Sequence, residues 1–231
     1  MELGRHFIGI VGPRGVGKTV MLKQLALYQP DSFYLSADTL ARSDLFQTAR
    51  ILSEQYKINI LLVDEIHFCK TYAKDLKKIY DFLSLRVVFT SSVSLSLFDS
   101  AYDLSRRIVL RHLYPFSFRE YLLFARHIEI PKLTLNDIIE GQWTADHMRY
   151  NHLFDEYLQG RLFPFFLEEP NCMPLLRNIC SKIIHRDIPM ACNLRFDDIE
   201  NTLEFIGKSE VDGINFSSIS RNRCSSVNTL I

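Results

Sequence analysis

The sequence has no excess of charge of either sign, because 27 lysines and arginines balance 27 aspartates and glutamates among its 231 residues. This balance excludes histone-like binding to nucleic acid, so any such contact would need a local basic patch. The composition is 47% hydrophobic, 12% aromatic and 23% charged, which is close to the average of globular proteins. Such a chain can bury at least one core, and general disorder is excluded.

Long hydrophobic runs are also missing. No uninterrupted apolar stretch approaches the roughly 18 residues that a membrane-spanning helix needs, and the run at residues 60–63 has the length of a strand. At the amino terminus, Glu2 and Arg5 precede a short apolar run that lacks the long core and the cleavage site of a signal peptide. We therefore expect a cytoplasmic protein without a membrane partner.

Cysteines are few and irregularly placed. The five are Cys69, Cys172, Cys180, Cys192 and Cys224. An odd number with uneven spacing fits reduced thiols better than a disulfide framework. The three central cysteines and His185 offer a zinc site as an alternative, but the closely spaced cysteine pairs typical of such sites are absent. We expect the thiols to behave as small buried hydrophobic groups.

The first half of the chain alternates strand-like runs with helical patterns. Between the runs, apolar residues recur at helical spacing, for example at Leu76, Ile79 and Leu83. The third run is almost wholly apolar, as expected of a strand that is covered on both faces. This alternation predicts an α/β fold in which a parallel five-stranded sheet is flanked by helices. The five expected strands are residues 7–11, 32–37, 59–63, 86–90 and 108–113.

The second half has helical patterns only. Tyr121, Phe124 and Ile128 lie on one face of an expected helix, and further helices are indicated around residues 175–183 and 199–206. The polar stretch 130–149 reads as a long connection or an inserted helix. These changes predict a first domain at 1–114, an α-helical region at 115–206, and a tail at 207–231 that is frayed or begins a further motif.

A glycine-rich motif follows the first expected strand. The sequence GPRGVGKT at residues 12–19 matches G-x-x-x-x-G-K-[ST], the phosphate loop. Glycines let backbone N–H groups turn inward around a phosphate chain, and the next helix adds its dipole. Lys18 would reach the β and γ phosphates, and the Thr19 hydroxyl would ligate Mg²⁺. The expected nucleotide-binding residues are Gly12, Pro13, Arg14, Gly15, Val16, Gly17, Lys18, Thr19 and Val20.

Two carboxylates end the third expected strand, in the sequence ILLVDE. Ligands of open parallel sheets bind at the carboxyl ends of the strands, so Asp64 is placed to hold Mg²⁺. Glu65 could orient and deprotonate the water that attacks the γ phosphate. The alternative is a solvated acidic pair at a strand end.

Two more groups are candidates because of their position. Thr90, Ser91 and Ser92 end the fourth strand, where a hydroxyl could bond the γ phosphate or the attacking water. Arg106 and Arg107 open the fifth strand, and an arginine there could neutralise charge on the transferring phosphoryl group, in its own subunit or a neighbour's. Asp38 and Arg14 flank the same edge, where they read best as solvated charges.

With these residues the chain resembles the bacterial and archaeal AAA-type P-loop ATPases, in which an AAA domain precedes helices and a winged helix. The matching segments are GPRGVGKT (12–19), FYLSAD (33–38), ILLVDEIH (60–67), FTSS (89–92), RIVLRHLYPFSFREYL (107–122), FDEYLQGRLFP (154–164) and IIHRDIP (183–189).

The resemblance assigns roles to individual residues. It implies that Lys18, Thr19, Asp64 and Glu65 carry nucleotide and Mg²⁺ (the Walker A and B elements), that residues 90–92 hold the sensor position, and that Arg107 is the catalytic arginine. Members usually have glycine where Ser91 and Arg106 stand. The family pattern also implies that this chain is shortened at both ends, with only a partial winged helix at 207–231.

Other phosphate-loop classes fit less well. Residues 64–67 spell the DExH box of helicases, but helicases need a second core and a far longer gap between loop and box. A small-molecule kinase would place an arginine-rich lid in the second half, and a GTPase would carry an Asn-Lys-x-Asp signature; the sequence has neither.

The expected function is Mg²⁺-dependent ATP hydrolysis, with Glu65 activating water and with nucleotide state moving the helical half. The alternative is a nucleotide-gated module that binds DNA or protein with little or no hydrolysis. ATP is the expected ligand, and the resemblance and Arg107 suggest a homo-oligomer.

Overall fold

The computed structural model of the protein describes residues 6–40, 44–92, 104–188 and 196–209. The chain divides into two compact units, residues 1–173 and 174–231, which are considered separately below. Most of the expected partial winged helix, together with Cys192 and Cys224, lies outside the described residues.

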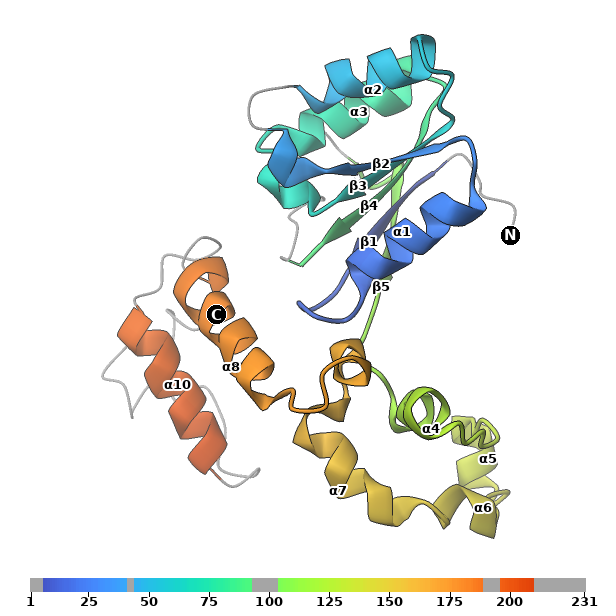
Figure 1. Cartoon of the computed structure of the whole chain (residues 1–231), viewed down its shortest axis with the longest axis vertical. Coiled ribbons are helices and arrows are strands. Elements are labelled where there is room, and N and C mark those ends of the chain that lie inside the picture. The colour runs from blue at the N-terminus through green and yellow to red at the C-terminus, as the bar shows by residue number, and fades with distance from the viewer. Residues whose placement is uncertain (1–5, 41–43, 93–103, 189–195, 210–231) are drawn as a thin grey trace. The chain divides into compact units, whose positions relative to one another are not determined.

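The first unit is built on a five-stranded sheet whose strands all run parallel. The strand order is β2-β3-β4-β1-β5. Helices α2 and α3 cover one face of the sheet and α1 lies on the other (Figure 1). The fold is therefore α/β, as the alternating pattern predicts. The strands are β1 (Phe7–Val11), β2 (Ser32–Ser36), β3 (Ile60–Asp64), β4 (Arg86–Ser91) and β5 (Ile108–His112).

The helices between the strands follow the expected apolar faces. They are α1 (Lys18–Tyr28), α2 (Leu45–Glu54) and α3 (Tyr72–Phe82). Asp44 caps α2, since its carboxylate accepts a bond of 2.9 Å from the N–H of Phe46. Every residue of β3 is buried, which explains why its sequence is continuously apolar rather than alternating.

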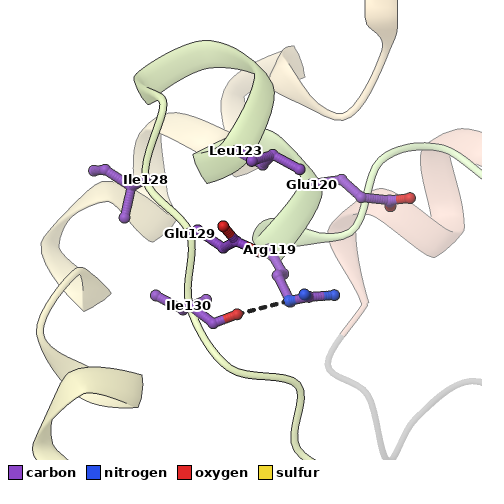
Figure 2. A pocket seen from close by; sticks show the side chains of 6 residues that line it. All are labelled: Arg119, Glu120, Leu123, Ile128, Glu129 and Ile130. Carbon is purple, nitrogen blue, oxygen red and sulfur yellow. Dashed lines mark hydrogen bonds between the residues drawn. The ribbon is translucent and has the colours of Figure 1, made fainter.

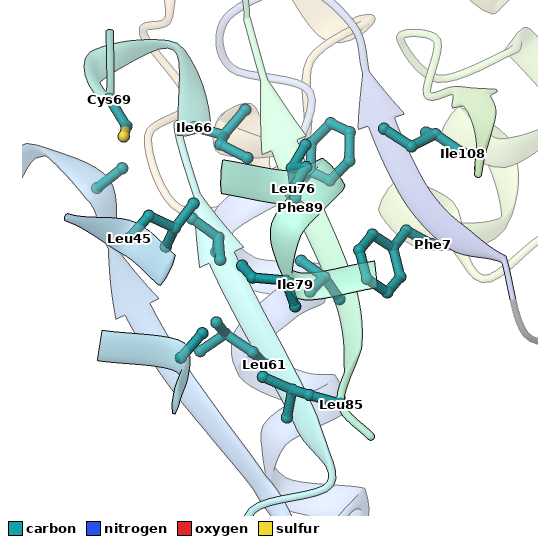
Figure 3. Packing of buried hydrophobic residues seen from close by; sticks show 14 of the residues in the cluster. Phe7, Leu45, Leu61, Ile66, Cys69, Leu76, Ile79, Leu85, Phe89 and Ile108 are labelled. Atoms are coloured by element: carbon teal, nitrogen blue, oxygen red, sulfur yellow. The ribbon is translucent and has the colours of Figure 1, made fainter. Parts of the chain in front are cut away.

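The sheet carries a core on each face. The larger core packs α2 and α3 against the sheet, with Leu61, Phe89 and Ile79 fully buried (Figure 3). The smaller core lies under α1, where Leu22 is fully buried against Leu62. Burying a side chain of this size stabilises the fold by roughly 1.5–3 kcal/mol. Both cores fix the strand ends, and these ends carry the candidate site.

The larger core contains a buried carboxyl group at the first turn of α3. The Asp75 side chain is 1% exposed and accepts a hydrogen bond of 2.7 Å from the Thr71 hydroxyl. Burial raises the pKa of Asp75 above its usual range; the Thr71 bond opposes this shift, and nearby Asp44 adds to it. Ionised Asp75 is thus less favourable in the folded protein than in the unfolded chain.

Asp75→Asn is therefore expected to raise the thermal unfolding midpoint at pH 7–8. A folded-state pKa above the unfolded value favours folding below about pH 4, and this contribution is lost as the pH rises through the folded-state pKa. The gain from the substitution should shrink toward pH 4, because about half of the Asp75 carboxyl groups in the unfolded chain are protonated there. Circular dichroism melts from pH 4 to 8 test this, with the exposed Asp155→Asn as control. Equal pH dependence of wild type and Asp75→Asn would contradict it.

Beyond β5 the first unit becomes helical. Helix α4 (Phe118–Arg126) begins with a capping box, in which Ser117 and Glu120 each bond the other's backbone N–H. Two short helices, α5 (Leu135–Ile139) and α6 (Ala145–Met148), occupy the polar stretch. Next come α7 (Phe154–Glu156), a wide turn at Tyr157–Arg161 and a 3₁₀ turn at Pro164–Leu167.

Aromatic side chains join these helical pieces. Tyr157 packs against Phe118 and Tyr121, and its hydroxyl donates a bond of 2.7 Å to the carbonyl of Phe116. The N–H of Phe116 in turn donates to the carbonyl of Leu162 at 2.7 Å. The segment that leaves β5 is thus tied to the chain that follows α7.

The second unit contains α8 (Met173–Lys182), whose first residue is the last of the first unit. A π-helical turn at Ile183–Asp187 and α10 (Phe196–Lys208) follow. Ile199 is buried. Over the described parts of both units, no helix combines the length and the apolarity that crossing a membrane requires.

Candidate functional site

The phosphate loop runs from the end of β1 to the start of α1. Gly15 and Gly17 adopt φ angles of 84° and 93°, in the left-handed region that favours glycine. Gly12 is required for a different reason, because a Cβ atom there would lie 2.1 Å from the carbonyl oxygen of Leu113. The backbone is therefore shaped as the sequence motif demands, and no side chain narrows the loop at these three positions.

Lys18 begins α1 with its side chain folded over the loop. It is 5% exposed, and its Nζ donates hydrogen bonds to the carbonyls of Gly12 at 2.9 Å and Pro13 at 2.8 Å. Burial lowers the pKa of Lys18, while the carboxylates of Glu65 and Asp64 oppose the shift. The ammonium group thus lies inside the loop with two carboxylates near it.

Asp64, the last residue of β3, is the centre of a hydroxyl cluster. Its Oδ2 accepts hydrogen bonds from the Thr19 hydroxyl at 2.7 Å and the Tyr34 hydroxyl at 2.9 Å, and its Oδ1 accepts one from Thr90. The Asp64 side chain is 4% exposed. Burial, followed by the bond to Asp64, raises the pKa of Tyr34 to about 12. Thr19 and Asp64, the two residues predicted to hold Mg²⁺, are therefore hydrogen-bonded to each other.

Glu65 follows with φ 51°, a left-handed conformation that non-glycine residues seldom adopt. Its N–H donates to the Thr90 hydroxyl at 2.9 Å. The Ser92 hydroxyl lies 2.8 Å from Oε1 and 2.7 Å from Oε2 of the Glu65 carboxylate. His67 Nδ1 lies 3.2 Å from Oε2 and also 3.2 Å from the Ser91 hydroxyl. Glu65 is thus held by the end of β4.

A cleft lies beside the loop, where the chain leaves β5. It has a volume of about 550 Å³. Leu113 lines it and is also the residue whose carbonyl faces Gly12. The lining residues are His112, Leu113, Tyr114, Pro115, Phe116, Ser117, Glu120, Tyr157 and Leu162.

A second pocket lies beside α4 and is much smaller, at about 20 Å³. Arg119 donates to the carbonyl of Ile130 at 2.8 Å within it (Figure 2). This volume is about that of one water molecule, so the pocket is too small for a nucleotide.

The site fits a triphosphate with a divalent cation. The loop has the glycine geometry of a phosphate cradle, and Lys18 supplies a cation within it. Thr19 and Asp64 supply hydroxyl and carboxylate oxygens, the donor type that Mg²⁺ prefers. No cluster of three or more metal-ligating His, Cys, Asp or Glu residues occurs among the residues with described positions, so nothing there supports the zinc alternative.

Arg107 is not brought to the phosphate loop of its own chain. It precedes β5 at the amino edge of the sheet, where its carbonyl accepts a bond from the N–H of Phe7, whereas the loop follows the carboxyl end of β1. Its guanidinium bonds both carboxylate oxygens of Asp81, at 3.1 and 3.2 Å, and lies over the Tyr80 ring. A role in the chain's own site is therefore inconsistent with this placement.

The remaining candidates lie near the loop. The Asp38 carboxylate accepts a bond of 2.5 Å from Ser36, at the end of β2. Arg14 is close enough to Lys18 to lower its pKa, although less than burial does. Val20 lies in the first turn of α1 with an exposed side chain.

Tyr34 and His67, which belong to neither the phosphate loop nor the acidic pair, also contact the site. Tyr34 lies within the segment FYLSAD, and its partner Asp64 ends the strand that pairs with β2. The tyrosine could be predicted to contact Asp64 only if the strand order, with β2 beside β3, were already known. His67 lies two residues after Glu65.

Comparisons with known proteins place the site in context. The sequence matches a family model described as an AAA domain over residues 4–122, slightly more than half of the chain. It is 31% identical over 208 residues to the uncharacterized protein MJ1637 of Methanocaldococcus jannaschii. The alignment covers 80% of this chain and 44% of that protein. The chain thus spans less than half the length of this relative.

Two solved structures are also similar. One is described as the FIGL-1 AAA domain in complex with ADP, with TM-score 0.40 and 16% identity over 53% of this chain and 48% of that chain. The other is PCH-2 of C. elegans, with TM-score 0.37 and 19% identity over 55% of this chain and 40% of that one.

Proposed function

Because the chain belongs to the AAA-domain family, we propose that it binds ATP together with Mg²⁺ and hydrolyses the bond to the γ phosphate. The observation that carries the proposal is the meeting of Lys18, Thr19 and Asp64 at one sheet edge, with the Thr19 hydroxyl 2.7 Å from Asp64. An ordinary glycine turn would need neither a buried lysine nor a carboxylate opposite it.

Each residue has a defined role in this proposal. The Lys18 ammonium would exchange its two loop carbonyls for oxygens of the β and γ phosphates. Thr19 and Asp64 would hold Mg²⁺. When bound, Mg²⁺ neutralises charge on the β and γ phosphates. The cleft beside Gly12 would receive the adenine base of ATP, next to the exposed ring of Tyr114.

Glu65 would act as the general base. It would accept a proton from the water that attacks the γ phosphorus, and the bond to the β-γ bridging oxygen would break to give ADP and phosphate. The Ser92 hydroxyl now bonds the Glu65 carboxylate. Ser92 could instead donate to the γ phosphate, which would leave Glu65 open to water.

A second function is favoured by one specific observation. Both carboxylate oxygens of Glu65 are engaged by Ser92, and one also by His67. If ATP does not release them, the protein is a nucleotide-gated module that binds DNA or protein without turnover. In either case nucleotide would move residues 115–206. A DNA or protein partner, oligomer formation and cytoplasmic location stay predictions from the sequence.

Phosphate release from ATP, measured with and without Mg²⁺ alongside ATP binding, tests the proposal. Mg²⁺-dependent release supports the ATPase. Binding without release, accompanied by changed hydrogen exchange over residues 115–206, supports the gated module. Absence of binding contradicts both.

We also propose that Arg107 acts at the site of a neighbouring subunit, since it lies far from its own loop. Mixing Glu65→Gln subunits with Arg107→Ala subunits should then give more turnover than the two separate preparations together, because some interfaces would combine an intact glutamate with an intact arginine. Steady-state phosphate release over a range of mixing ratios measures this. Turnover that only averages the two parents would rule out action across subunits.

A further inference from the structure

The hydroxyl of Tyr34 is directed at the carboxylate that would hold the metal. Tyr34 lies in the middle of β2, and its hydroxyl is 2.9 Å from Oδ2 of Asp64 on the neighbouring strand. Its ring packs against the core under α1, and the Lys23 Nζ lies 5.8 Å from the ring centre. Packing therefore fixes the ring, and the ring sets the position of its hydroxyl.

The bonds to Asp64 divide unequally between its two oxygens. Oδ1 accepts the bond from Thr90, whereas Oδ2 accepts bonds from both Thr19 and Tyr34. In the proposed function Thr19 would also turn a lone pair toward Mg²⁺. Tyr34 and Thr90 are not needed as metal ligands, so they can keep one bond to each oxygen and define the plane of the carboxylate.

We propose that Tyr34 is a positioning residue for the metal-holding carboxylate of Asp64. The phenol would prevent rotation of the carboxylate and satisfy one of its lone pairs, so that the remaining lone pairs face the cation. Partners that bond a ligating carboxylate typically change metal affinity or activity by about 10- to 100-fold. This inference rests on the proposed function, because it requires that Asp64 hold Mg²⁺.

Tyr34→Phe tests the proposal, because it removes one oxygen atom and keeps the ring in its packing. ATP binding would be measured by calorimetry in EDTA and across a Mg²⁺ titration, with Mn²⁺ binding followed by electron paramagnetic resonance. We expect the Mg²⁺ concentration that gives half of the maximal effect on ATP affinity to rise about tenfold. ATP affinity in EDTA should equal that of wild type. Tyr28→Phe is the matched control, since the Tyr28 side chain is 80% exposed at the end of α1.

The outcomes separate this inference from the proposed function. If ATP binding depends on Mg²⁺ in the wild type and depends on it equally in Tyr34→Phe, the role of Tyr34 alone is overturned. Equal losses of ATP affinity with and without metal would also overturn it, since they would indicate general loosening of the site. A wild type that binds ATP without any effect of Mg²⁺ overturns the magnesium site and this inference together.

Discussion

Glu65→Gln is expected to lower ATP turnover by about 10²- to 10⁴-fold while leaving ATP binding close to that of wild type. Glutamine has nearly the same shape, and its amide oxygen can still accept the bond from the Ser92 hydroxyl. It cannot take a proton from water at neutral pH. The loss should therefore appear in the rate constant of the chemical step, which single-turnover phosphate release measures directly.

Glu54→Gln is the control for this substitution, because Glu54 is exposed at the end of α2. It should turn over ATP at the wild-type rate. A Glu65→Gln variant that keeps more than about a hundredth of wild-type turnover would show that another group takes the proton, since a general base contributes at least about 10²-fold. A variant that also fails to bind ATP would point to a structural role for the Glu65 side chain, which accepts the bond from Ser92, and thermal melts would test that role.

Lys18→Ala is expected to weaken ATP binding by about 10- to 100-fold, since it removes hydrogen bonds from a charged donor that contribute about 1.5–3 kcal/mol. Turnover at saturating ATP should fall by a further 10²- to 10³-fold, because the ammonium also stabilises charge that develops in the transition state. Calorimetry and phosphate release measure the two losses separately.

The folded state should tolerate this substitution. Burial lowers the pKa of Lys18, which means that its charge is held in the fold at a cost. Lys18→Ala should accordingly melt no more than a few degrees below wild type, and Lys74→Ala, on the exposed face of α3, should bind ATP normally. Unchanged ATP affinity in Lys18→Ala would overturn the phosphate loop as the binding site.

The strands could be predicted to within about one residue because each crosses a sheet that is covered by helices. A buried run such as 60–64 has few structural alternatives at that length. The meeting of Lys18, Thr19 and Asp64 followed from the rule that parallel strands end at one edge.

Other features depend on facts that no local pattern encodes. The contact of Tyr34 with Asp64 depends on β2 lying beside β3. The direction of Arg107 follows from its position before β5 rather than after it, and its pairing with Asp81 comes from the end of α3. The chain also breaks at Gly160, whose φ of 105° interrupts the helical turn at Tyr157–Arg161.

The close approach at Gly12 makes the phosphate loop and the exit from β5 mechanically interdependent. A loop with no room for one carbon atom beside the Leu113 carbonyl has little room to shift toward it without pushing that chain. Three residues further on, Phe116 is bonded to the chain after α7. We therefore expect a displacement of the loop toward Leu113 to displace the exit from β5 as well.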